Sequence, residues 1–264
     1  MQLHYEELGE GNPIIILHGL YGSSNNWLNV GKKLADSYKV YLIDQRNHGN
    51  SSHAESHTYE DMMEDLRSFI DEKKLQDIVL IGHSMGGKTA MLYTISYAEM
   101  IKNLIVVDIS PRNYNIIVNN TIQTSDHKLI LEAMNKLDLN AVTSRSKAIE
   151  MLSKDIPDIN LCQFLLKNLR RNKNHTYEWK INLNAINTNI TNMLSGVSRG
   201  NNDMPNHSVL FVRAENSRYI MDDDYFLIRK IFPKTEIVTI PDAGHWVHVE
   251  QPDLLIKTIC YFIN

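Results

Sequence analysis

Ser84 stands where a serine can act as a nucleophile. Residues 82–86 read Gly-His-Ser-Met-Gly, a G-x-S-x-G motif that follows a short apolar, β-branched run. The next run, residues 88–97, spaces its apolar side chains as a helix does. A strand, a sharp turn and a helix are the context in which this motif exposes a serine hydroxyl. The sequence therefore predicts covalent catalysis through Ser84; the alternative is a serine that serves only the turn.

A serine hydroxyl needs a base to accept its proton and a carboxylate to orient that base. In such a fold the order along the chain is serine, acid, histidine. His245 fits the base because it follows Gly244 in a loop between the last predicted strand and the last predicted helix. His248 is the competing base, and a zinc site made from both histidines has no evident third ligand.

Three carboxylates compete for the role of the acid. Asp108 ends an apolar run that begins at residue 104, directly after the predicted helix of the nucleophile. Its carboxylate is therefore expected at the same sheet edge as Ser84. Glu215 and Asp222 follow the next predicted strand and are the rivals. We favour Asp108, whose alternative role is to cap a helix or order a loop.

Acyl transfer also needs hydrogen-bond donors for the oxyanion of the tetrahedral intermediate. The backbone N–H of Met85 is one expected donor, because it begins the helix after the nucleophile. The backbone N–H of Leu20 is the other, in the turn His-Gly-Leu-Tyr-Gly at residues 18–22. No phosphate-binding G-x-G-x-x-G motif accompanies these residues, and we expect neither a cofactor nor a metal.

Strand-like and helix-like runs alternate at both ends of the chain. The expected strands are residues 14–18, 39–43, 78–81, 104–109, 208–212 and 236–240, preceded by an antiparallel strand pair around residues 3–8. The expected helices are residues 25–37, 59–74, 84–97, 223–231 and 253–262. This rhythm predicts an α/β fold with a mostly parallel sheet and helices on both faces.

The rhythm stops between residues 112 and 205, where the sequence turns polar and rich in asparagine. Helices are expected there at residues 128–137, 147–154, 161–169 and 183–194, and a short strand at residues 177–181. About ninety residues are too many for a loop. We therefore expect an α/β core of residues 1–111 and 206–264, with residues 112–205 as a helical cap over the carboxyl edge of the sheet.

Composition restricts the class of protein. The 264 residues carry 27 Lys and Arg against 31 Asp and Glu, a formal net charge of −4, with no basic stripe that would suit nucleic acid. Two distant cysteines in apolar patterns are typical of reduced thiols. Neither a secretory signal nor an apolar run long enough to span a bilayer is visible. We expect a cytoplasmic protein, as a monomer or small homo-oligomer.

Five stretches together resemble the α/β-hydrolase fold superfamily, in particular its YbfF-type esterase branch. They are residues 18–27, 44–53, 82–88, 107–114 and 244–252. The resemblance implies a mostly parallel eight-stranded sheet flanked by helices, with an inserted helical cap. It also supports Asp108 as the acid, because Asn and Ser stand at positions 216–217, where many other members carry theirs.

The resemblance further implies the reaction and some of the substrate contacts. The expected reaction is hydrolysis of carboxylic esters or thioesters with short to medium acyl chains, acyl-CoA among them, through an acyl-serine. Tyr21 and Trp246 are expected to line an apolar pocket with Leu20 and Met85. Arg46 and His48 are expected near its mouth, where they either touch a polar substrate group or shape a loop.

Two other functions remain open at this point. A C–C bond hydrolase or lyase of the same fold uses the same three residues, and the lining of the cap decides between the two. A ligand receptor with a retained triad and slow turnover is an alternative from another class. Families whose nucleophile is an aspartate are disfavoured, because Ser84 occupies that position.

Overall fold

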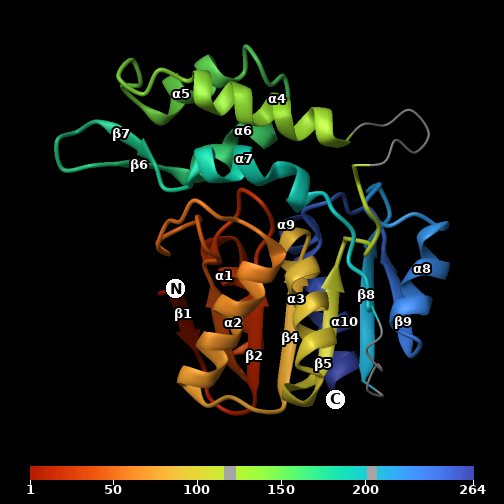
Figure 1. Ribbon diagram of the computed structural model, residues 1–264. Helices are drawn as coiled ribbons and strands as arrows, with labels where there is room; N and C mark the ends of the chain where they lie inside the picture. The colour runs from red at the N-terminus through yellow and green to blue at the C-terminus, as the bar shows by residue number, and fades with distance from the viewer. Residues whose placement is uncertain (116–122, 201–206) are drawn as a thin grey trace.

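A single twisted sheet organises the computed structural model, which describes residues 1–115, 123–200 and 207–264 (Figure 1). Its strands are β1 (Tyr5–Leu8), β2 (Pro13–Leu17), β3 (Lys39–Ile43), β4 (Ile78–His83), β5 (Ile101–Val107), β8 (Ser208–Ala214) and β9 (Thr235–Ile240). Their order across the sheet is β1-β3-β2-β4-β5-β8-β9. Only β1 runs antiparallel to its neighbour; every other pairing is parallel.

The described sheet has seven strands, so the expected eight-stranded count is wrong for this part of the chain. A single antiparallel strand opens the sheet, where a pair was expected around residues 3–8. The physical reason is the turn that follows β1. Gly9 and Gly11 both adopt positive φ, at 69° and 108°, so the chain reverses at once into the parallel strand β2.

Helices cover both faces of the sheet and bury two apolar cores. They are α1 (Leu28–Leu34), α2 (Tyr59–Lys73), α3 (Met85–Ser96), α8 (Asp224–Ile231), α9 (Val247–Glu250) and α10 (Pro252–Ile263). Because side chains alternate along a strand, Ile14 and Ile16 join the core beneath α1 and α10. Ile15 and Leu17 join the other core, which includes residues of α2, α3 and α8.

The inserted segment forms a layer above the carboxyl ends of the parallel strands (Figure 1). It contains α4 (Gln123–Lys136), α5 (Arg145–Leu152), α6 (Ile159–Leu165) and α7 (Leu183–Met193). A two-stranded ribbon, β6 (Leu169–Arg171) and β7 (Tyr177–Trp179), lies between α6 and α7. The helix expected up to residue 169 therefore ends early, because the chain leaves α6 to pair as β6.

The boundary expected at residues 205 and 206 lies outside the described residues, and the division into core and cap stays a prediction. Short 3-10 turns complete the described elements: η1 (Ser24–Trp27), η2 (Ala98–Met100) and η3 (Leu166–Asn168). Across the described ranges, no helix is both long and apolar enough to cross a membrane.

The packing of β8 leads to a test of the core with a matched pair of phenylalanines. Phe211 on β8 is fully buried against Phe232, whereas Phe226 on α8 is 79% exposed. We expect Phe211→Ala to lower the free energy of unfolding by about 3–5 kcal/mol, because it leaves a cavity. Phe226→Ala should change it by no more than about 0.5 kcal/mol. Urea unfolding measures both, and equal losses would contradict the proposed packing.

Candidate active site

Ser84 occupies the single residue between the end of β4 and the start of α3. Its backbone has φ 53° and ψ −118°, a conformation that L-residues rarely adopt. The amide of Ser84 donates a hydrogen bond to the carbonyl of Val107 at 3.1 Å, which ties this turn to the end of β5. Such local strain is typical of functional sites, where the surrounding structure holds it in place.

Two glycines make this turn possible. A Cβ on Gly82 would lie 2.3 Å from the carbonyl oxygen of Gly86, far inside van der Waals contact. A Cβ on Gly86 would lie 2.4 Å from the carbonyl oxygen of Leu17 on β2. The two glycines of the G-x-S-x-G motif are therefore required by the close approach of α3 to the strands.

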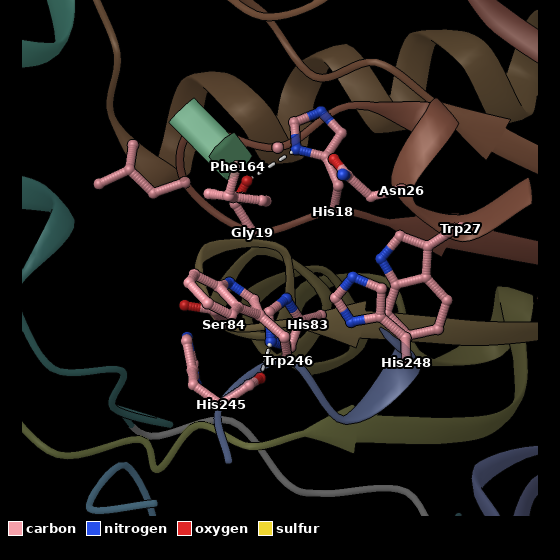
Figure 2. Close-up of a pocket in the computed structure, with 12 residues that line it drawn as sticks. His18, Gly19, Asn26, Trp27, His83, Ser84, Phe164, His245, Trp246 and His248 are labelled. Atoms are coloured by element: carbon pink, nitrogen blue, oxygen red, sulfur yellow. Dashed lines mark hydrogen bonds between the residues drawn. The ribbon is translucent and has the colours of Figure 1, made fainter. Parts of the chain in front are cut away.

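His245 and Asp108 form the hydrogen bond that organises the site. The Nδ1–H of His245 donates to Oδ2 of Asp108 at 2.8 Å. In the neutral ring this leaves the lone pair on Nε2, so that Nε2 can act as a base. His245 and Ser84 line the same cavity (Figure 2).

Asp108 is fully buried and holds its carboxylate with donors from β8 and the loop after it. The amide of Ala214 donates to Oδ1 at 3.1 Å, and the hydroxyl of Ser217 donates to Oδ2 at 2.5 Å. These donors offset the cost of burying the charge. Ser217 occupies one of the two positions where many other members of the α/β-hydrolase superfamily carry their acid. In this chain it donates a hydrogen bond to Asp108 instead.

The rival carboxylates lie elsewhere. Glu215 accepts a hydrogen bond from the amide of Asp242 at 3.0 Å. Asp222 forms an ion pair with Arg213, and its side chain is 82% exposed. Of the three candidates, the structure brings only Asp108 to His245.

Two aromatic rings support His245. The Nε2–H of His83, the residue before Ser84, donates to the carbonyl of His245 at 2.8 Å. The ring of Tyr219 stacks on the imidazole of His245, with centroids 3.9 Å apart and planes 20° apart. Together with Asp108, these contacts restrict both the backbone and the ring of His245.

His248, the competing base, serves as a wall of the cavity. Its ring stacks on Trp27 with centroids 4.6 Å apart, on the opposite side of the cavity from Ser84 (Figure 2). Burial lowers the pKa of His248 to about 3, so its ring is neutral at pH 7. Within the described residues, no three His, Cys, Asp or Glu side chains lie close enough together to hold a metal ion, and this includes the surroundings of His248.

The turn with the expected oxyanion donor lies against Ser84. A Cβ on Gly19 would lie 3.0 Å from the Cβ of Ser84. His18 orders this turn: its Nδ1–H donates to the carbonyl of Gly19 at 2.8 Å, and its Nε2 accepts from the amide of Gln45 at 3.0 Å. The amides of Leu20 and Met85 donate no hydrogen bond to another described residue.

Two cavities meet at Ser84 and Leu20. The first, which we call the His245 cavity, has a volume of about 280 Å³. It is also lined by His18, Gly19, Gly22, Asn26, Trp27, His83, Phe164, His245, Trp246 and His248. The second, which we call the Met85 cavity, has a volume of about 330 Å³. It is also lined by Tyr59, Met85, Ile109, Tyr114, His127, Met193, Leu194 and Tyr219.

Of the four residues expected to bind substrate, Trp246 lines the His245 cavity, where its ring lies 5.0 Å from that of Phe164. Tyr21 lines neither cavity. It packs beneath the inserted segment, where its carbonyl accepts a hydrogen bond from Asn168 at 2.7 Å. Its ring lies 5.9 Å from that of His127. Tyr21 therefore supports the wall of a cavity from behind.

Arg46 and His48 also line neither of the two cavities at Ser84. Arg46 is buried in an ion pair with Asp65 at 2.6 Å. The Nε2 of His48 accepts from the amide of Tyr21 at 3.3 Å, and its Nδ1–H donates to the carbonyl of Arg46 at 2.9 Å. Neither residue lines a cavity at Ser84, and these hydrogen bonds agree with the alternative that both residues shape a loop.

Three further residues at the site were not found from the sequence. Tyr219 stacks on His245, while Phe164 and His127 reach the cavities from α6 and α4. Burial lowers the pKa of His127 to about 4, so this ring is neutral at pH 7 as well. No local motif marks these residues: Phe164 and His127 reach the cavities because the inserted segment lies over the sheet, and Tyr219 reaches the site from the loop after β8.

Comparison with known proteins decides the family. Residues 12–252 match the family described as alpha/beta hydrolase fold. The chain belongs to this family. A solved structure named marine microorganism esterase is 44% identical, covers 99% of both chains and superposes with a TM-score of 0.93.

Curated relatives agree with this assignment. An sn-1-specific diacylglycerol lipase of Danio rerio is 36% identical over 266 residues, covering 98% of this chain and 81% of the relative. Esterase YbfF of Escherichia coli (strain K12) is 28% identical, covering 96% of this chain and 93% of that protein. The expected YbfF-type branch is confirmed, and these relatives support a hydrolase of the esterase type.

The hydrogen bond from Ser217 to Asp108 can be tested by substitution. We expect Ser217→Ala to lower the free energy of unfolding by about 1.5–3 kcal/mol, because a buried carboxylate loses a charge-assisted hydrogen bond. Ser68→Ala is the matched control, since this exposed serine bonds only a backbone carbonyl of its own helix. Urea unfolding at neutral pH measures both variants. A Ser217→Ala protein as stable as the control would argue against the bond to Asp108.

Proposed function

We propose that this protein is a serine hydrolase that cleaves carboxylic esters or thioesters through an acyl-serine intermediate. Ser84 is the nucleophile, His245 the general base and acid, and Asp108 the carboxylate that orients His245. The observation that carries the proposal is the 2.8 Å bond from His245 Nδ1 to Asp108, with His245 and Ser84 in one cavity.

The reaction runs in two halves. Ser84 Oγ attacks the acyl carbonyl carbon while His245 Nε2 takes the hydroxyl proton. The N–H groups of Leu20 and Met85 stabilise the oxyanion, since neither is engaged by another described residue. His245 then gives its proton to the leaving oxygen or sulfur, the bond to the acyl carbon breaks, and a water activated by His245 cleaves the acyl-serine.

The two cavities suggest how the substrate lies. His245 lines only the first cavity, and the leaving group must receive its proton from His245. We therefore place the alcohol or thiol portion in the His245 cavity and the acyl chain in the Met85 cavity.

The Met85 cavity suits an apolar acyl chain. The hydroxyl of Tyr59 donates a hydrogen bond to the carbonyl of Met193 at 2.7 Å. The hydroxyl of Tyr114 donates to the carbonyl of Tyr219 at 2.5 Å. Their rings therefore present mainly apolar surface to the cavity. This favours short to medium acyl groups, and the names of the relatives, a diacylglycerol lipase and two esterases, support an ester substrate.

The nucleophile is tested by removing its hydroxyl. We expect Ser84→Ala to lower kcat/KM for p-nitrophenyl butyrate by about 10⁴-fold or more, because no acyl-serine can form. A fluorophosphonate probe should label the wild-type protein and not this variant. Ser52→Ala, which changes an exposed serine, is the control and should keep both properties. A Ser84→Ala protein with wild-type turnover would rule out the mechanism, and tight ligand binding without turnover would favour a receptor.

The orientation of the substrate is tested by one change in each cavity. Met193→Phe should lower kcat/KM for p-nitrophenyl hexanoate relative to acetate by about 10–200-fold, because it fills the cavity assigned to the acyl chain. Phe164→Ala should instead change selectivity within a series of acetate esters with different alcohols. The opposite pattern, with Phe164→Ala setting acyl length, would reverse the assignment of the two cavities.

A further inference from the structure

Lys88 is a buried lysine that the proposed reaction does not use. It lies on α3 one turn after Ser84, and its amide donates to the carbonyl of Ser84 at 3.2 Å. Only 1% of Lys88 is exposed, although lysine is among the residues least often buried. Among the described residues, no carboxylate forms an ion pair with its ammonium group.

The partners of Lys88 belong to the two segments that join the inserted layer to the sheet. Its Nζ donates to the carbonyl of Arg112 at 3.1 Å and to the carbonyl of Ser195. We call residues 110–115 and 194–197 the cap connectors, because the chain enters the inserted layer through the first and leaves it through the second. One ammonium group thus binds both connectors, which are far apart in sequence.

The connectors also pair with each other. The amide of Tyr114 donates to the carbonyl of Leu194 at 2.7 Å, and the amide of Val197 donates to the carbonyl of Pro111 at 2.8 Å. The ammonium of Lys88 bonds to carbonyls within this paired stretch and also lies 4.6 Å from the centre of the Tyr114 ring. A buried ammonium is costly unless it is hydrogen-bonded, and burial lowers the pKa of Lys88 to about 7. Backbone carbonyls and an aromatic face offset part of that cost.

The connectors form part of the cavity assigned to the acyl chain. Tyr114 and Leu194 both line the Met85 cavity beside Ser84. The hydroxyl of Tyr114 donates to the carbonyl of Tyr219 at 2.5 Å, and the ring of Tyr219 stacks on His245. A shift of the connectors would therefore move the wall of the cavity and the ring that supports His245.

We propose that Lys88 is a positioning residue: its ammonium fastens both cap connectors to the helix of the nucleophile and so sets the wall of the Met85 cavity. This inference rests on the proposed function, since it assigns the acyl chain to that cavity. The effect should grow with acyl length, because a longer chain reaches Tyr114 and Leu194 whereas an acetyl group stays at Ser84.

Two substitutions separate the hydrogen bonds of Lys88 from its bulk. Lys88→Met keeps a long apolar side chain without donors, whereas Lys88→Gln retains two N–H donors. Thr94→Val is the matched control, because Thr94 is a buried polar residue of α3 whose hydroxyl bonds only the carbonyl of Ala90. For each protein, kcat and KM are measured separately with p-nitrophenyl acetate and p-nitrophenyl hexanoate.

We expect Lys88→Met to lose at least about tenfold more kcat/KM for hexanoate than for acetate, mainly through KM. Lys88→Gln should recover part of this difference, and Thr94→Val should show none of it. Equal losses for both esters, or no loss, would overturn the proposal. If Lys88→Met does not fold, the comparison of Lys88→Gln with Thr94→Val decides in the same way.

A measurement on the wild-type protein tests the connectors independently. The amides of Tyr114 and Val197 should be protected from hydrogen exchange, and rapid exchange at both would overturn the proposal. Fluorophosphonate labelling of wild-type Ser84 separates the two proposals. Failure to label would refute the serine hydrolase, whereas labelling without a chain-length effect in Lys88→Met would refute only the role of Lys88.

Discussion

The hydrogen bond from His245 to Asp108 is the interaction on which the site depends. It fixes which imidazole nitrogen carries the proton, and thereby which nitrogen can face Ser84. A buried carboxylate can hold this place only with further donors, and Ala214 and Ser217 supply them. The ring of Tyr219 then holds the imidazole from its face, so the orientation of His245 follows from contacts on several elements.

The parallel sheet makes this bond possible. Strands β4 and β5 are neighbours in register, with His83 opposite Val107, so Ser84 and Asp108 follow directly at the same edge. In this register the amide of Ser84 donates a hydrogen bond to the carbonyl of Val107. Because Gly82 and Gly86 have no side chain, α3 can begin directly after Ser84 in close contact with the strands. Close backbone packing in the core is thus the condition for a strained, partly buried serine at the edge of the sheet.

The inserted layer supplies part of the lining of both cavities at Ser84. Phe164 contributes to one cavity, and His127, Met193 and Leu194 to the other. Hydrogen bonds join this layer to the core through the connectors, through Tyr21, and through residues 47–59, which bond to Asn182, Asn189 and Met193. Under the proposed function, specificity for acyl length and for the leaving group therefore depends on how this layer docks.

Local sequence patterns alone determined most of the sheet. Apolar runs of strand length and the glycines of the G-x-S-x-G motif reflect short-range constraints on the chain. Ser84, Asp108 and His245 could be proposed from the sequence because each lies at or near the end of a predicted strand or the start of a predicted helix. The roles of Arg46, Tyr219, Phe164 and Lys88 were decided only in three dimensions. Their partners lie on elements distant in sequence, and a side chain without a local motif acquires its function from the neighbours that folding brings to it.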